Sequence, residues 1–205
     1  MENFNIELII YILTGLASIG LIIAYIPQTT ELIKVKNADG ISHFFWVFIS
    51  LSTSYSMFNL YVTFAHGFIL FAQTINAIAA FLILIKVASL KYNNLKSILF
   101  ISIYTTLNFI FYILGTVELA QTIASIAIVL AYIDQIIYFI KNKKSTGTNP
   151  LMYLIFSLSI LMLAISMILS ETHLYIITTE LINAVLLSVC LLLSIKYKNK
   201  SVEAN

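Results

Sequence analysis

The chain has 205 residues, of which 60% are hydrophobic and 10% charged, and its mean hydropathy is +0.99. Soluble domains are about 25% charged, so this composition excludes a water-surrounded globule. The formal net charge of +2 is too small to indicate nucleic-acid binding. Because about 20 apolar residues cross a bilayer as a helix, seven spans would leave room for short loops only. The composition therefore predicts an all-α membrane protein without a separate enzyme domain.

Apolar runs long enough to cross the membrane recur along the whole chain. Helices are expected in all of them, because an open strand would leave backbone groups unpaired in lipid. The seven predicted spans are 7–27, 43–64, 68–88, 96–114, 118–140, 150–169 and 173–195. No basic residue precedes the first span, so we interpret it as a permanent span rather than a secretion signal.

The basic residues indicate how the spans are oriented. All of them are lysines, and under a seven-span threading all lie on one side of the membrane. They are Lys34, Lys36, Lys86, Lys91, Lys96, Lys141, Lys143, Lys144, Lys196, Lys198 and Lys200. Since lysines gather in cytoplasmic loops, we expect a protein of the cell membrane with its N-terminus outside and its C-terminus in the cytoplasm.

The sequence contains an internal repeat, because a shift of 107 residues aligns the chain with itself. The shift aligns Ala24-Tyr25-Ile26 with Ala131-Tyr132-Ile133, Gly40 with Gly147, and Ile75-Asn76-Ala77 with Ile182-Asn183-Ala184. We predict two three-span units, 7–92 and 118–199, joined by a linker helix at 96–114. The odd linker span makes the two units parallel, and parallel repeats are one known transporter architecture, with the substrate site at the repeat interface.

Proline and glutamine follow each other near the lysine-rich end of the first span. The run Tyr25-Ile26-Pro27-Gln28 is followed by Asn37-Ala38-Asp39-Gly40-Ile41-Ser42, and the second copy reads Tyr132-Ile133-Asp134-Gln135. Together with the repeat, this pattern resembles the PQ-loop motif of the SWEET and SemiSWEET transporters and their PQ-loop relatives. The resemblance covers nearly the whole chain. It implies seven helices in a 3+1+3 order that move a small polar solute, a sugar or similar, by alternating access.

Asn76 and Asn183 occupy equivalent repeat positions and are candidate substrate-binding residues. An amide offers both donors and acceptors to a hydroxyl-rich solute, and an asparagine at the matching place lines the sugar pocket of SWEET-like transporters. An interhelical hydrogen bond is the alternative interpretation. Gln73 and Glu180 lie three residues earlier on the same helix faces. Glu180 is a functional candidate because it is ionisable within a span, unless nearby headgroups hydrate it.

The resemblance also implies an aromatic platform for the sugar in spans two and six. Tyr55 is the nearest aromatic residue in span two, whereas Met162 to Ala164 provide none in span six. This departure, with Glu180 and Asp134, favours the alternative of a proton-coupled PQ-loop carrier of amino acids or a vitamin. A seven-helix receptor is less favoured, because no basic residue lies mid-span to hold a peptide carboxylate.

A gate is expected at the lysine-rich end of the spans. SWEET-like transporters have a ring of four prolines there, and Pro27 and Pro150 fill two of the places. The repeat aligns Pro27 with Asp134 and Pro150 with His43, or with Ser42 in another register. We hypothesise that protonation of an Asp134–His43 pair biases the gate; the alternative is a carboxylate that hydrogen-bonds a neighbouring helix in a wet vestibule. The expected gate residues are Pro27, Gln28, His43, Asp134, Gln135 and Pro150.

The sequence gives no indication of a catalytic centre. It has no His/Cys cluster with metal-ligand spacing and no glycine-rich phosphate loop. We therefore expect no enzymatic activity, no cofactor and no metal. The expected partners are a small polar solute, the lipid bilayer and, in the coupled alternative, protons. No nucleic-acid partner is expected, and the sequence leaves a homo-oligomer open.

Overall fold

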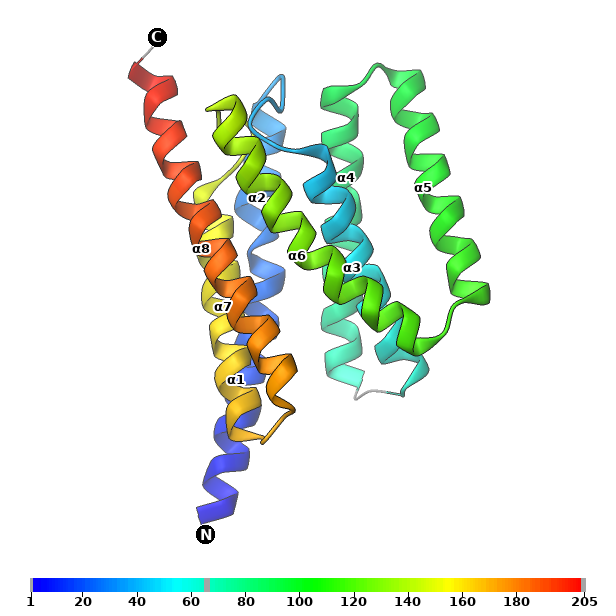
Figure 1. The fold of residues 1–205 in the computed structure, drawn as a ribbon, viewed down its shortest axis with the longest axis vertical. Coiled ribbons are helices and arrows are strands. Elements are labelled where there is room, and N and C mark those ends of the chain that lie inside the picture. Colours follow the sequence, from blue (N-terminus) through cyan, green and yellow to red (C-terminus); the bar gives the residue numbers. More distant parts are fainter. Residues whose placement is uncertain (1, 65–66, 204–205) are drawn as a thin grey trace.

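The computed structural model describes residues 2–64 and 67–203, and every regular element within them is a helix. The helices are α1 (Glu2–Ile23), α2 (Tyr25–Lys34), α3 (His43–Val62), α4 (Gly67–Lys91), α5 (Asn94–Leu114), α6 (Val117–Asn142), α7 (Pro150–Leu169) and α8 (Leu174–Glu203). Most run along the long axis of the molecule, and α6 crosses it obliquely (Figure 1). The α2–α3 and α6–α7 loops meet at one end, which we call the lysine-rich end.

Within the described residues, six helical segments are long and apolar enough to cross a membrane. They are Ile6–Lys34, which includes α1 and α2, Ile69–Lys91, Asn94–Leu114, Val117–Asn142, Pro150–Leu169 and Ile176–Lys198. They coincide with six of the seven predicted spans. The segments indicate a multi-pass membrane protein, and the prediction of an all-helical membrane fold is confirmed at this level.

The remaining predicted span, 43–64, corresponds to α3 and is less apolar than the others. At 20 residues α3 is long enough to span, but Ser50, Thr53 and Asn59 are among its buried residues. It packs against both α4 and α6. Its polar side chains therefore face other helices, where hydrogen-bond partners exist, and α3 needs less apolar surface than a lipid-facing helix.

The first predicted span is interrupted at Ala24, between α1 and α2. Pro27 explains the interruption, because proline has no N–H to donate and its ring clashes with the carbonyl four residues earlier, that of Ile23. In the second copy Asp134 takes the place of proline, and α6 continues unbroken through this position. One substitution within the repeat thus makes the two equivalent helices differ in shape.

The helix contacts in the first half of the chain (α1–α4) reappear in the second half (α6–α8). α4 contacts α1 and α3, and α8 contacts α6 and α7 in the corresponding way. Between the halves, α1 packs on α7 and α3 packs on α6. α5 lies at the outer edge against α4 (Figure 1), and it reaches α3 through hydrogen bonds from Tyr104 and Tyr112.

The largest apolar cluster joins both halves. Its bulkiest fully buried members are Phe45, Trp46, Phe139 and Tyr153. Tyr153 packs edge-on against Phe139, with ring centroids 6.2 Å apart, and Phe45 packs edge-on against Trp46 at 5.0 Å. These rings hold α3, α6 and α7 together next to the two loops.

The close approach of α1 and α7 depends on Gly20, because a Cβ there would collide with the Ser159 side chain. We expect Gly20→Ala to lower the free energy of unfolding by about 1–3 kcal/mol, as overpacked helix contacts do. Gly15→Ala is the matched control, since its added methyl group has no described atom within 4 Å apart from the neighbouring backbone of its own helix. Thermal unfolding in detergent micelles measures both variants. Equal melting midpoints would show that this contact tolerates a methyl group.

Candidate functional site

A cavity of about 230 Å³ lies between the two halves of the chain. Every helix except α5 contributes to its lining. Most lining residues come in pairs that the 107-residue shift relates, such as Asn76 with Asn183, Gln73 with Glu180, and Tyr25 with Tyr132. The cavity is therefore built from the same positions of both repeats.

Four of the residues predicted to contact the solute line this cavity. Asn76 and Gln73 reach it from α4, and Asn183 and Glu180 reach it from α8. The prediction that equivalent residues of the two repeats lie together thus agrees with the geometry. Their role in binding a solute stays a prediction.

Tyr55, the fifth residue, lies outside the cavity lining. Its ring stacks on Phe111 of α5, with centroids 4.1 Å apart and planes 16° from parallel. Only 5% of Tyr55 is exposed. The linker helix covers the face of α3 that carries this ring, so the ring is not available as an aromatic platform in the cavity.

Hydrogen bonds determine how the two asparagine amides are oriented. Asn183 Nδ2 donates to Glu180 Oε2 at 3.4 Å, as it must, because a carboxylate only accepts. Asn76 Nδ2 donates to Gln73 Oε1 at 3.2 Å, and Gln73 Nε2 donates to the carbonyl of Thr53 at 2.9 Å. Both asparagine Oδ1 atoms are buried, and no described group donates to them. Neither asparagine side chain makes a described hydrogen bond to another helix.

The two sides of the cavity differ in chemistry. Hydroxyl and amide side chains line it from α3 and α6, namely Ser52, Thr53, Ser56, Gln121 and Ser125. Apolar side chains line it from α7, namely Phe156, Ile160 and Leu163. Sequence reasoning missed this polar wall. The available signal was Thr53 and Ser56 of α3, which the repeat aligns with the apolar Ile160 and Leu163 of α7.

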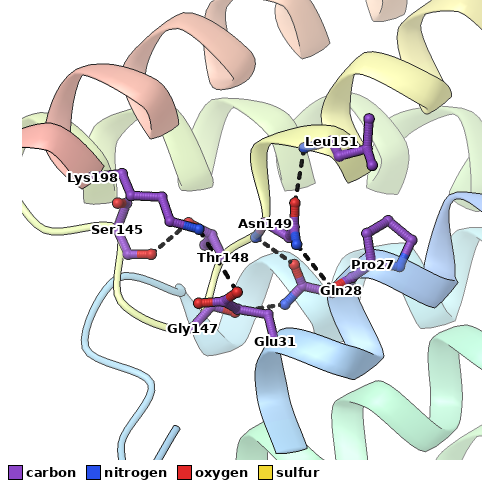
Figure 2. Close-up of polar contacts among 9 residues, drawn as sticks. All are labelled: Pro27, Gln28, Glu31, Ser145, Gly147, Thr148, Asn149, Leu151 and Lys198. Carbon is purple, nitrogen blue, oxygen red and sulfur yellow. Dashed lines mark hydrogen bonds and ion pairs between the residues drawn. The ribbon is translucent and has the colours of Figure 1, made fainter. Parts of the chain in front are cut away.

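On the lysine-rich side the structure joins the two loops through buried glutamines. Gln28 is fully buried in α2 and binds the α6–α7 loop. Its Nε2 donates to the Gly147 carbonyl at 2.7 Å, and its Oε1 accepts from the Asn149 backbone N–H at 3.0 Å (Figure 2). Both ends of the side-chain amide are therefore used by the other half of the chain.

Gln135 makes the reciprocal pair of bonds. It is fully buried in α6, donates to the Gly40 carbonyl at 3.0 Å and accepts from the Ser42 backbone N–H at 3.0 Å. The loops also touch directly, since the Gly40 N–H donates to the Thr146 carbonyl at 2.9 Å. A Cβ at Gly40 would collide with the backbone of the other loop, which explains the glycine. We call Gln28 and Gln135 the crossed glutamines, because each binds the loop of the other repeat.

Further contacts strengthen this connection. Asn149 caps α7 by accepting from the Leu151 N–H at 3.0 Å, and its Nδ2 donates to the Pro27 carbonyl at 3.2 Å (Figure 2). Ion pairs join Lys198 to Glu31 at 3.7 Å and Lys144 to Asp39 at 3.3 Å. The lysine-rich end is thus tied across the two halves by side-chain, backbone and ionic contacts.

The predicted Asp134–His43 pair is not formed. Pro150 and His43 do occupy equivalent places, as the first residues of α7 and α3. However, His43 Nδ1 shares a hydrogen bond of 2.8 Å with the Tyr92 hydroxyl, and its ring packs edge-on against Phe100 at 4.9 Å. Asp134 Oδ2 and His43 Nε2 are both buried without a partner among the described residues. The aromatic contacts hold the imidazole toward the α4–α5 junction.

Comparisons of the chain with protein-family models, with curated proteins and with solved structures find no match. The resemblance to PQ-loop transporters accordingly remains an interpretation of the sequence. What the structure adds is a cavity between two sequence-related halves and a set of crossed contacts on one side of it.

Proposed function

We propose that this protein is a transporter of the PQ-loop type that moves a small polar solute across the cell membrane by alternating access. The cavity carries the proposal, because repeat-related residues line it and the crossed glutamines tie the halves together on one side. Transporters built from parallel repeats bind their substrates at such an interface. At about 230 Å³ the cavity suits a solute smaller than the drug-sized ligands held by pockets of about 300–1,000 Å³.

In this proposal the chain forms two parallel three-helix units, 7–92 and 118–199, joined by the linker helix 96–114. The helix contacts support this arrangement. The 107-residue shift relates the α1–α7 contact to the α6–α3 contact, and the α3–α4 contact to the α7–α8 contact. The chain ends lie at opposite ends of the molecule (Figure 1), as seven passes that include α3 require. Because lysines gather in cytoplasmic loops, their positions predict that the α2–α3 and α6–α7 loops lie in the cytoplasm and the N-terminus outside.

The structure corresponds in this scheme to a state closed toward the cytoplasm. The cavity lies nearer the opposite end, because Gln121 and Thr179 belong to the second turns of α6 and α8. Opening the cytoplasmic side requires breaking the four hydrogen bonds of the crossed glutamines, each with a net contribution of about 0.5–1.5 kcal/mol.

A second candidate function is proton-coupled transport of an amino acid or a vitamin. Glu180 favours it, because a carboxylate within a membrane-spanning helix is costly unless it is paired, hydrated or protonated. A proton that enters with the solute would neutralise this group. The alternating movement of the two halves would be the same in both functions.

A reversible cross-link between the loops tests alternating access. Uptake of labelled sugars, amino acids, amines and vitamins by proteoliposomes first identifies a transported solute. Asp39→Cys with Lys144→Cys, in a Cys190→Ser background, then places two thiols where an exposed ion pair joins the loops. We expect a short, cleavable thiol cross-linker to abolish uptake and its cleavage to restore uptake. The single-cysteine variants are the controls. Undiminished uptake by fully cross-linked protein would contradict the mechanism.

A further inference from the structure

We propose that the cavity recognises a primary ammonium group on a small, largely apolar body without a carboxylate, that is, an organic amine. The proposal rests on the transport function above and specifies the solute class of the same cavity. It follows from three properties of the lining: which hydrogen-bonding atoms remain unused, which charge is present, and how polarity is distributed between the walls.

The buried polar atoms of the lining that have no described partner at all are acceptors. Asn76, Asn183 and Gln73 each direct one side-chain N–H to a protein acceptor and keep a second N–H. No described group donates to the Oδ1 atom of either asparagine, and Asn183 is the one described donor to the Glu180 carboxylate. Both Oδ1 atoms are buried in this conformation, so binding requires the lining to move until the ammonium group reaches them. A primary ammonium group has three N–H donors, which matches this set of acceptors.

The charge of the lining selects a cation. Glu180 is the only acidic residue among the described lining residues, and none of these is Lys, Arg or His. A solute ammonium group would supply the counter-charge that an isolated carboxylate in a membrane lacks. The carboxylate of an amino acid would find no positive partner here. A sugar offers hydroxyl donors but leaves the charge of Glu180 unbalanced.

The uneven walls favour an apolar body on the amine. The residues that line the cavity from α7, Phe156, Ile160 and Leu163, are all apolar, whereas α3 and α6 contribute hydroxyl and amide side chains as well as apolar ones. A polyol would place hydroxyl groups against this apolar wall without hydrogen-bond partners, which is unfavourable. An aryl- or alkyl-amine buries its hydrocarbon there and directs its ammonium group to Glu180.

Binding to the purified full-length protein in detergent tests this directly. The probes are 2-phenylethylamine, its neutral analogue 2-phenylethanol, the zwitterion phenylalanine, and glucose, each measured by isothermal titration and thermal shift. We expect the amine to bind at least about tenfold more tightly than any other probe, a difference of about 1.4 kcal/mol. Equal or tighter binding of phenylalanine or glucose overturns the proposal.

Two variants separate the charge of Glu180 from its position. Glu180→Gln installs the residue that the first repeat already has at Gln73, and it should remove the preference for the amine while keeping the binding of 2-phenylethanol. Combining Gln73→Glu with Glu180→Gln moves the carboxylate to the equivalent place on α4. We expect this exchange to restore the preference. If Glu180→Gln keeps the preference for the amine, or if the folded exchange variant fails to restore this preference, the proposal is wrong.

Uptake measurements distinguish failure of this inference from failure of the transport function. Amine binding in detergent without uptake of the amine by proteoliposomes overturns transport and leaves the amine site standing. Uptake of a sugar or an amino acid, without preferential binding of 2-phenylethylamine, supports transport and overturns the amine site.

Discussion

Replacing both crossed glutamines by leucine is expected to open the lysine-rich end of the cavity. The double variant Gln28→Leu/Gln135→Leu removes four hydrogen bonds between the halves. It also leaves two loop carbonyls and two loop N–H groups without their partners, at about 1–3 kcal/mol for each group that stays buried. Only separation of the loops lets water satisfy these groups, so the equilibrium shifts toward the open state.

The reactivity of a cavity cysteine measures this opening. Ser125→Cys, in a Cys190→Ser background, places a thiol in the cavity lining. We expect a membrane-impermeant maleimide, added at the lysine-rich side, to label it at least about tenfold faster in the double-leucine variant, as a shift of about 1.4 kcal/mol predicts. Asn108→Leu is the matched control, because it removes a buried amide of α5 away from the loops. An unchanged labelling rate would mean that the glutamines do not hold the end closed.

Asn76→Leu is expected to stabilise the protein and to stop transport. The buried Oδ1 atom of Asn76 has no described partner, and such an atom costs about 1–3 kcal/mol, which leucine of similar size avoids. The same substitution removes an acceptor from the cavity. The melting midpoint should therefore rise or stay unchanged while solute uptake disappears. This combination is expected for a residue that binds the solute and does not stabilise the fold.

Asn59→Leu is the contrasting variant. Each substitution removes a hydrogen bond to a glutamine, at 2.8 Å from Asn59 to Gln121 and at 3.2 Å from Asn76 to Gln73. Asn59 has no buried atom without a partner, so its replacement brings no compensating gain and stability should fall. If Asn76→Leu instead lowers the melting midpoint and keeps normal uptake, Asn76 is a structural amide. Melting in detergent and uptake by proteoliposomes, measured on the same preparations, decide between the two roles.

The repeat predicted the parts of the cavity that depend on chain symmetry. Asn76 and Asn183 were expected to lie together because the shift makes them equivalent, and both line the cavity. Tyr55 was misplaced for a physical reason. Helical spacing indicates which residues share a face, but it does not indicate which neighbouring helix covers that face, and here Phe111 of the linker helix does.

The contacts of the crossed glutamines were beyond the reach of sequence reasoning. Gln28 and Gln135 were assigned to the gate, but their partners are backbone atoms, which every residue carries and no pattern distinguishes. The same limit applies to His43 and Asp134. The repeat aligned their positions with the two prolines, whereas the Tyr92 hydroxyl that engages the imidazole lies outside the motif.

The interruption at Ala24 gives the two halves unequal stiffness. Proline has already removed the hydrogen bond to Ile23, so the first helix can change its angle there without losing another. α6 keeps an N–H at Asp134, and bending it would break at least one backbone hydrogen bond in a medium that offers no replacement. We therefore expect the two halves, despite their corresponding helix contacts, to move differently in the proposed transport cycle. In that cycle, we expect the first span to bend at Ala24 while α6 stays straight.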